Sequence, residues 1–448
     1  MKTPIFDFVK QYAASEISRF HMPGHKGISS ALGCEPLDIT EVNGADVLYS
    51  PCGIIAESEE NATSLFETAH TFYSAEGSSL AIKAMLALAT EITGSRERPL
   101  ILAARNAHKA FLYACALLDL DVEWLYPGEE SHLCSCVLSA EDVENALTAS
   151  SRKPSAVYLT SPDYLGQLSD IKGIAKTCHA HGVPLLVDNA HGAYLKFLKP
   201  SLHPMDLGAD LCCDSAHKTL PVLTGGAYLH VSKNADPAYV ERARENLSVF
   251  ASTSPSYLIL QSLDLCNAYL ADGYREKLNA CVQKVNAAKQ SLALMGFATE
   301  VSEPLKIVFQ ARLFGYSGEE LASYLRGHRI EAEFADDSIL VLMVTPSTRE
   351  IDFKRLLKAF QSLPKKTPLS PKSIPTPRAC HAQKISIRKA IFSSRERVSA
   401  ENAVGRICAT PTVSCPPAIP IVVSGEVITE EDAELFRSRG INEVAVIK

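Results

Sequence analysis

From about Phe66 to Val231, short apolar runs alternate with longer amphipathic stretches. Four runs are continuously apolar and bounded by polar or turn residues, as buried strands are: 100–103, 156–159, 184–187 and 227–230. The segments 80–92 and 171–181 between them carry apolar residues at helical spacing. Apolar strands that alternate with helices predict an α/β fold with a mainly parallel sheet covered on both faces.

Beyond this region the pattern predicts further domains. The pattern predicts long helices over residues 257–294. Within residues 305–363 it predicts strands at 306–309 and 338–342 and a helix. Prolines then recur in a stretch that favours an extended linker, at positions 364, 368, 371, 375 and 377. Thr429 as N-cap and Gly440 as stop predict a helix before a strand at 441–447. We predict an N-terminal arm (1–55), a large domain (56–295), a small α/β domain (296–363), a linker (364–378) and a C-terminal α+β domain (379–448).

Composition narrows the class of protein. With 46% apolar residues among 448, the chain can bury a sizeable core, and its formal net charge of −7 argues against nucleic acid and anionic membranes as partners. The N-terminus lacks the apolar run of a signal peptide, and no stretch is long enough to cross a bilayer. The 13 cysteines include no C-x-x-C pair, which favours reduced thiols over disulfides or a metal site. We therefore expect a cytoplasmic protein.

Two motifs at the predicted strand ends are suited to a phosphorylated ring cofactor. Gly77, Ser78 and Ser79 precede an alanine-rich helix, whose N–H groups and dipole could hold a phosphate. Asp188 ends a buried strand and could pair with a pyridinium nitrogen. Each motif also suits an ordinary helix N-cap, so neither decides the function alone.

A third motif supplies a lysine. Lys218 lies between Ser215, His217 and Thr219 after a strand, a setting in which a lysine can form an imine. A lone lysine is usually a solvated surface group, so the order of the motifs matters more. In this chain the phosphate site is followed by an aspartate about 110 residues later and by a lysine about 30 residues further on. This order and spacing are the layout of fold-type I enzymes, which use pyridoxal 5'-phosphate (PLP). His108, after the strand 100–103, is the candidate for stacking on the ring.

Ordered motifs over almost the whole chain resemble the Orn/Lys/Arg decarboxylases of fold type I, in the branch similar to biosynthetic arginine decarboxylase. The resemblance implies the aspartate-aminotransferase-like fold. The motifs are Phe20-His21-Met22-Pro23-Gly24-His25-Lys26-Gly27, residues 38–41, 46–48 and 51–53, Arg105–Lys109, residues 160–166, Val187–Gly192, Ser215-Ala216-His217-Lys218, residues 252–257, Gly405-Arg406-Ile407, Cys415–Pro420 and Gly425-Glu426. Departures include Asn189, where the family usually has Glu, and Ala418, where it usually has Gly.

The resemblance implies a role for each matching residue. Lys218 carries PLP, Asp188 binds the ring nitrogen, His108 stacks on the ring and His191 lies near the ring's O3′ side. Phosphate contacts come from Gly77, Ser78 and Ser79, which we call the phosphate cradle, and from Ser215 and His217 of the lysine motif. Thr253 and Ser254 reach the phosphate from a partner subunit, which makes a homodimer the minimum unit and allows higher oligomers with shared sites.

The implied reaction is decarboxylation of a basic amino acid for polyamine biosynthesis, with Lys218 or His217 returning the proton. Arginine is the first candidate substrate, and lysine or ornithine follow. The distal cation of such a substrate needs an acid, for which Asp46, Glu41 and Glu426 are candidates, although each could be an ordinary surface residue. No metal is expected.

Three alternatives stay open. An aminotransferase would need an arginine for the α-carboxylate, and no motif marks Arg312, Arg326 or Arg329 as that residue. A carbon–sulfur lyase would share the PLP fold. A non-catalytic PLP-binding regulatory homologue would be expected to lose Lys218 or Asp188, and both are present.

Overall fold

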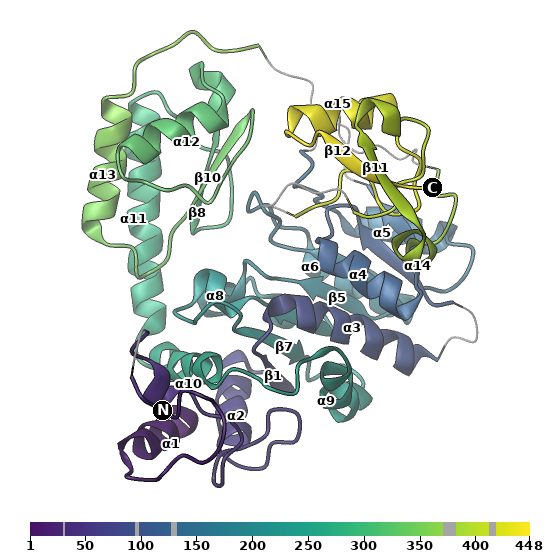
Figure 1. The fold of residues 1–448 in the computed structure, drawn as a ribbon. Helices are drawn as coiled ribbons and strands as arrows, with labels where there is room; N and C mark the ends of the chain where they lie inside the picture. The colour runs from purple at the N-terminus through teal and green to yellow at the C-terminus, as the bar shows by residue number, and fades with distance from the viewer. Residues whose placement is uncertain (30–31, 95–97, 127–131, 371–381, 412–417) are drawn as a thin grey trace. The chain divides into compact units, whose positions relative to one another are not determined.

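A computed structural model describes residues 1–29, 32–94, 98–126, 132–370, 382–411 and 418–448 of the chain (Figure 1). The chain forms two compact units, each assembled from separate stretches of sequence. The first unit contains Met1–Glu97, Ser155–Leu159 and Ile171–Glu276, and the second contains Arg98–Pro154, Thr160–Asp170 and Lys277–Lys448.

The largest sheet has seven strands in the order β1-β7-β6-β5-β4-β2-β3. They are β1 (His70–Ser74), β2 (Leu100–Ala104), β3 (Asp121–Leu125), β4 (Ala156–Thr160), β5 (Leu185–Asp188), β6 (Leu211–Asp214) and β7 (Ala227–Val231). The pairs β2–β3 and β5–β6 are parallel, whereas β7 is antiparallel to both β1 and β6. The predicted α/β class with a mainly parallel sheet is confirmed, and the four predicted strands are β2, β4, β5 and β7.

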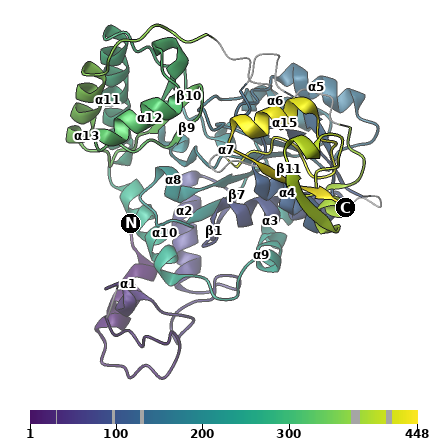
Figure 2. The same cartoon turned by 45° about the horizontal axis from the view of Figure 1, so that its top comes forward.

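The helices of the first unit pack on its strands and on one another. They are α1 (Pro4–Ala14), η1 (Glu35–Leu37), α2 (Ile54–Phe66), α3 (Gly77–Thr93), α6 (Ile171–Ala180), η2 (Ala193–Phe197), α7 (Pro204–Leu207), α8 (Ala216–Thr219), α9 (Ala238–Phe250) and α10 (Tyr257–Ala271). Helix α3 is rich in alanine and leucine, which favour helix, and it ends at Gly94 in the left-handed conformation. It lies against β6, β7 and α9, and α1 packs against α2 and α10 (Figures 1 and 2).

The second unit contains β2 and β3 of the large sheet, the helices α4 (Lys109–Leu118) and α5 (Ala140–Ala149), and most of the long α11 (Tyr274–Leu294), which begins in the first unit. The predicted small α/β region of this unit contains β8 (Lys306–Gln310), η3 (Ala311–Phe314), α12 (Gly318–Gly327), β9 (Phe334–Ala335), β10 (Ile339–Met343) and α13 (Glu350–Gln361). Strand β10 pairs antiparallel with both β8 and β9. Residues 364–370 of the predicted linker form no helix or strand, and residues 371–378 lie outside the described residues.

The C-terminal part of this unit contains α14 (Ile387–Phe392), β11 (Arg395–Ser399), η4 (Glu401–Ala403), α15 (Glu430–Ser438) and β12 (Glu443–Ile447). Thr429 caps α15 as predicted, because its hydroxyl accepts from Asp432 N while the Asp432 carboxylate accepts from Thr429 N. Strand β11 pairs antiparallel with β12 (Figure 1). The motif residues Cys415, Pro416 and Pro417 lie outside the described residues.

Candidate active site

The predicted phosphate cradle lies at the start of α3. Gly77 has a φ of +70° and its N–H donates to Gly225 O at 2.7 Å. A Cβ built on Gly77 would meet no atom within 4 Å, so space is open beside this backbone. Ser78 Oγ accepts a hydrogen bond from Ser215 Oγ at 2.7 Å, and Ser79 is half-buried one residue further into the helix. The cradle therefore meets the lysine motif directly.

Lys218 lies on α8, a single helical turn that begins after Ser215. Its backbone N–H donates to Ser215 O at 3.0 Å, and its Nζ lies 3.1 Å from His191 Nε2. His191 is buried in the loop that follows β5. The fold thus brings together Ser78, Ser215, Lys218 and His191, which come from two strand ends and one helix start.

His217 is held by the backbone of the turn before β7. Its N–H donates to Gly226 O at 3.2 Å, and its ring Nδ1 lies 3.1 Å from the same oxygen. Because a carbonyl oxygen only accepts, Nδ1 carries the proton. Burial lowers the pKa of His217, Gly226 opposes this effect, and the nearby Lys218 cation lowers the pKa further. The ring is therefore held in its neutral form with Nε2 as the acceptor.

Asp188 is buried at the end of β5. Its Oδ2 accepts from Tyr158 OH at 3.1 Å, and its Oδ1 accepts from Ala190 N at 3.2 Å and lies 3.6 Å from Cys213 Sγ. Burial raises the pKa of Asp188, and the nearby Lys218 is the largest opposing influence. A buried acid of this kind is suited to binding a cationic ring nitrogen.

Thr253 and Ser254 are exposed in the loop after α9. This loop is tied to the cradle, because Ser252 N donates to the Glu76 carboxylate at 2.6 Å. Glu76 directly precedes Gly77. The two predicted phosphate contacts are thus linked to the cradle within one chain, and their reach into a partner subunit stays a prediction.

His108 belongs to the second unit, where it is the N-cap of α4. Its ring Nδ1 accepts from Ala110 N at 3.1 Å, and the side chain is half-buried. The extended backbone of His108 is typical of an N-cap residue. Its predicted stacking on the cofactor ring stays a prediction.

Two of the three acids predicted for the substrate cation are engaged in the fold. Asp46 accepts five backbone N–H groups, from Val47, Cys52, Gly53, Ile55 and Ala56, around the start of α2. Burial raises the pKa of Asp46, but these hydrogen bonds outweigh it and the pKa is lowered. Glu426 is 1% exposed, accepts from Val423 N at 2.7 Å and lies 3.7 Å from Arg105. Glu41 is exposed.

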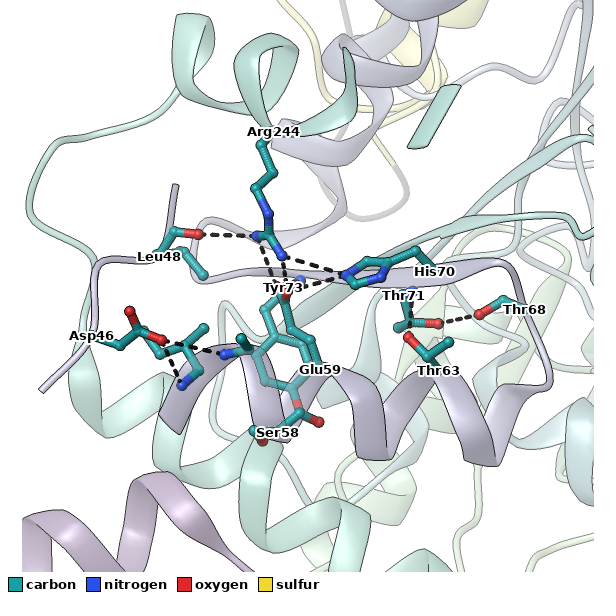
Figure 3. Close-up of polar contacts among 12 residues, drawn as sticks. Asp46, Leu48, Ser58, Glu59, Thr63, Thr68, His70, Thr71, Tyr73 and Arg244 are labelled. Carbon is teal, nitrogen blue, oxygen red and sulfur yellow. Dashed lines mark hydrogen bonds and ion pairs between the residues drawn. The ribbon is translucent and has the colours of Figure 1, made fainter. Parts of the chain in front are cut away.

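A polar cluster around the buried Glu59 lies beside Asp46 in the first unit (Figure 3). The Arg244 guanidinium, from α9, contacts the Glu59 carboxylate, Leu48 O and the His70 ring. The Glu59 side chain is fully buried and also accepts from Tyr73 N at 2.9 Å. This cluster joins α2, β1, α9 and the loop that contains Asp46.

Sequence reasoning missed Tyr158, the donor to Asp188, and the buried residues around Asp214 beneath the lysine motif. Tyr158 stands between the aliphatic residues Val157 and Leu159 of a buried strand, and a buried tyrosine hydroxyl needs a partner, which is the signal that could have indicated it. His203 and His230 carried no such signal, because isolated histidines are common. No helix among the described residues has the length and apolarity that crossing a membrane requires.

Comparison with known proteins gives a consistent result. The family described as "Orn/Lys/Arg decarboxylase, major domain" matches residues 3–310, and "Orn/Lys/Arg decarboxylase, C-terminal domain" matches residues 371–438. The chain is 31% identical to an arginine decarboxylase of Halalkalibacterium halodurans over 97% of this chain and 93% of the relative. It is also 31% identical to the protein YaaO of Bacillus subtilis, with the same coverage. The crystal structure of the lysine decarboxylase LdcF of Francisella novicida matches with a TM-score of 0.79 at 16% identity, over 100% of this chain and 81% of that chain, which shows the shared fold.

Proposed function

Because the chain belongs to the Orn/Lys/Arg decarboxylase family, we propose that it is a PLP-dependent decarboxylase of a basic amino acid, with arginine as the first candidate and lysine or ornithine next. The observation that carries the proposal is the meeting of the cradle with the lysine motif. Ser215 Oγ donates to Ser78 Oγ at 2.7 Å, and Lys218 Nζ lies 3.1 Å from His191. An amine, an anion cradle and a buried acid thus occupy one unit.

The residues present fit PLP. The open space beside Gly77 leaves room for a phosphate at the start of α3, with the Ser78, Ser79 and Ser215 hydroxyls as donors. Asp188 would hold the ring nitrogen, and that cation would lower the pKa that burial raises. Bound PLP supplies a protonated ring that accepts the electron pair left by the departing carboxylate.

The chain's own residues account for the handling of protons. His217 Nδ1 is engaged with Gly226 O, so Nε2 is the ring atom that can take up and return a proton. Lys218 Nζ is the second candidate, and its contact with His191 orients it. Stacking by His108 on the ring is part of the same proposal.

For the distal cation of the substrate, the geometry favours Glu41. The Asp46 carboxylate is surrounded by backbone N–H groups, and Glu426 is buried beside Arg105, whereas Glu41 is exposed. A relative with nearly full coverage is an arginine decarboxylase, which supports arginine as the first candidate. Glu41→Gln would test this role: we expect a higher KM with little change in kcat, because a distal contact binds substrate and transition state alike.

The proposal extends to assembly and setting. Thr253 and Ser254 are exposed beside the cradle loop and would contact the phosphate of a partner copy, so the unit would be a homodimer or larger with shared sites. We place the enzyme in the cytoplasm, with its amine product serving polyamine biosynthesis. Light scattering of the purified protein would test the dimer, and a monomer that binds PLP fully would contradict it.

An aminotransferase fits the structure less well. Arg312 pairs with Asp337 at 2.9 Å and donates to Ser370 O, and Arg326 pairs with Glu331 at 2.9 Å. Two of the three arginines considered for the α-carboxylate are thus engaged within the second unit. The family match also favours decarboxylation over transamination or carbon–sulfur cleavage.

The test is an absorbance scan of the protein with PLP, followed by CO₂ detection with arginine, lysine and ornithine in turn. We expect the visible band of an imine on Lys218 and CO₂ from one of the three amino acids. Lys218→Ala should abolish the band, whereas Lys172→Ala, at an exposed lysine of α6, should retain it. A band without CO₂ would contradict the decarboxylase, and no band would contradict PLP itself.

A further inference from the structure

Beneath the candidate site lies a buried polar cluster that the proposed reaction does not use. Asp214, the last residue of β6, is fully buried together with His203 and His230. Its Oδ2 accepts from His203 Nε2 at 3.0 Å and from His230 Nε2 at 3.1 Å. Its Oδ1 accepts from Asn189 Nδ2 at 2.6 Å. We name these four residues the Asp214 hub.

The three carboxylate and imidazole groups of the hub are close enough to hold a metal ion, but their hydrogen bonds point to a different role. His203 Nδ1 accepts from Met205 N at 3.3 Å, so its Nε2 carries the proton that it donates to Asp214. His230 Nδ1 lies 2.9 Å from Thr71 Oγ1, which continues to Thr68 Oγ1 at 2.8 Å (the Thr71–Thr68 contact is drawn in Figure 3). Each ring thus has a partner for both nitrogens, so neither ring has a free nitrogen with which to bind a metal ion.

The charge of Asp214 is held by these donors. Burial raises the pKa of Asp214, but the two histidines outweigh burial and lower the pKa well below its ordinary value. The carboxylate is therefore ionised in the interior, where a charged or polar group without a hydrogen-bonding partner costs free energy of folding. Replacing any donor with an acceptor should move the segments attached to it.

Those segments carry the candidate site. Asp214 is followed by Ser215, which contacts Ser78 and begins the turn that holds Lys218. Asn189 lies between Asp188 and His191, and its N–H donates to Cys213 O at 3.0 Å. One carboxylate thus joins the end of β5 and its following loop, which contain Asp188 and His191, to helix α8 after β6, which contains Lys218.

The Asn189 amide lies directly against Gly192. A Cβ built on Gly192 would lie 1.9 Å from Asn189 Oδ1, so the amide fills the space above Gly192. Aspartate has the length of asparagine, so an aspartate at position 189 would place a second carboxylate beside Asp214 and repel it, whereas the amide donates to it.

We propose that Asp214 is a positioning residue of the PLP site, and that its bond with Asn189 sets the spacing between Lys218 and the Asp188–His191 pair. The proposal rests on the proposed function. A 1 Å misplacement of reacting groups can cost a rate factor of about 100, so a shared anchor beneath both segments has a measurable effect.

The test exchanges the donor and the acceptor. Asn189→Asp places two carboxylates together, and we expect PLP affinity to fall by about 10- to 100-fold, as for lost outer-shell partners. The double variant Asn189→Asp/Asp214→Asn restores the match, because Asn at 214 can donate to Asp at 189 and still accept from both histidines. We expect it to regain PLP affinity to within about threefold of wild type.

Two measurements separate positioning from stability. PLP affinity and the pH dependence of the imine band are recorded on folded protein, beside the thermal unfolding midpoint. The matched control is Asp336→Asn in the second unit, where a buried aspartate accepts from His132 at 2.9 Å. It should lower the midpoint and leave PLP affinity unchanged. If Asn189→Asp gives too little folded protein, Asn189→Ala removes the same donor and should weaken PLP binding by about tenfold.

The outcomes are distinct. Wild-type PLP affinity in both Asn189 variants, or a double variant that stays as weak as Asn189→Asp, would overturn the positioning role. One zinc or other divalent ion per chain in wild-type protein purified without chelator would overturn the hydrogen-bonded assignment in favour of a metal site. A wild-type protein that shows no imine band would contradict the proposed function instead.

Discussion

His191 Nε2 lies 3.1 Å from Lys218 Nζ, and the two residues come from the segments that follow adjacent parallel strands, a loop after β5 and helix α8 after β6. The carboxyl ends of parallel strands lie at one edge of a sheet, and β5 and β6 therefore bring together residues 27 positions apart. The lysine that would carry the cofactor is oriented by a buried imidazole.

This contact leads to the first prediction. His191→Ala should lower kcat by about 100-fold, because Lys218 loses the partner that holds its amine for proton transfer. The imine band should still form but change its pH dependence. His179→Ala, at a histidine of α6 paired with Asp210, is the control. Unchanged turnover in His191→Ala would remove His191 from the site.

The hydroxyl of Tyr158 supports the second prediction. Tyr158→Phe removes the donor to Asp188 Oδ2 at 3.1 Å. A hydrogen bond to a charged group contributes about 1.5–3 kcal/mol, so PLP affinity should fall by about tenfold or more. Titration of apoprotein with PLP measures this, and Tyr113→Phe, on the exposed side of α4, should bind as wild type does. Equal affinities in the two variants would show that Tyr158 does not support Asp188.

The ion pair between Arg244 and Glu59, drawn in Figure 3, predicts a loss of stability when its cation is removed. Arg244→Leu leaves the fully buried Glu59 carboxylate without its cation and should lower the free energy of unfolding by about 3–5 kcal/mol. Urea unfolding measures the loss. The double variant Glu59→Gln/Arg244→Met removes both charges and should recover most of it. A double variant as unstable as the single one would locate the loss in packing.

Asp264 predicts a pH dependence of stability. Its Oδ2 accepts from Ile5 N and Phe6 N at the start of α1, and its Oδ1 accepts from Ser58 Oγ. Burial raises the pKa of Asp264 to about 6 from its ordinary 3.8. The folded state therefore binds this proton more tightly than the unfolded state does, so the contribution is present at pH below 3.8 and lost as the pH rises through about 6.

Asp264→Asn removes that titration while keeping an oxygen for the two N–H groups. Relative to wild type, the variant should gain about 2–3 kcal/mol of unfolding free energy between about pH 4 and pH 7. Urea unfolding at the two pH values measures the gain. A difference between variant and wild type that does not change with pH would contradict the shifted pKa.

Ala418 offers a stabilising substitution. It has a φ of +58°, in the left-handed region that disfavours a residue with a Cβ. Its carbonyl accepts from Lys109 N at 3.0 Å, which holds this conformation at the start of α4. The family usually has glycine here. Ala418→Gly should raise the free energy of unfolding by about 1 kcal/mol, net of the entropy that glycine adds to the unfolded chain, and thermal unfolding would show it.

Two of the strands that the sequence did not reveal, β3 and β11, were missed for the same reason. Strand β11 is Arg-Glu-Arg-Val-Ser with an exposed first half, so it has neither an apolar run nor an alternating pattern. Strand β3 starts with an acid and is only partly buried. Pairing with β12 and β2 makes both of them strands, and pairing partners are not visible in local sequence.

The sequence by itself determined the fold class, the order of the motifs and the family, because apolar periodicity and ordered motifs are local properties of the chain. It placed Gly77, Asp188 and Lys218 at helix starts and strand ends, where the structure has them. Only the tertiary structure showed that Asp46 and Glu426 are already engaged by the fold, and that Asp214, His203, His230 and Asn189 meet beneath the lysine. Such hydrogen bonds join residues far apart in sequence, and their partners are decided by how strands and loops pack rather than by local pattern.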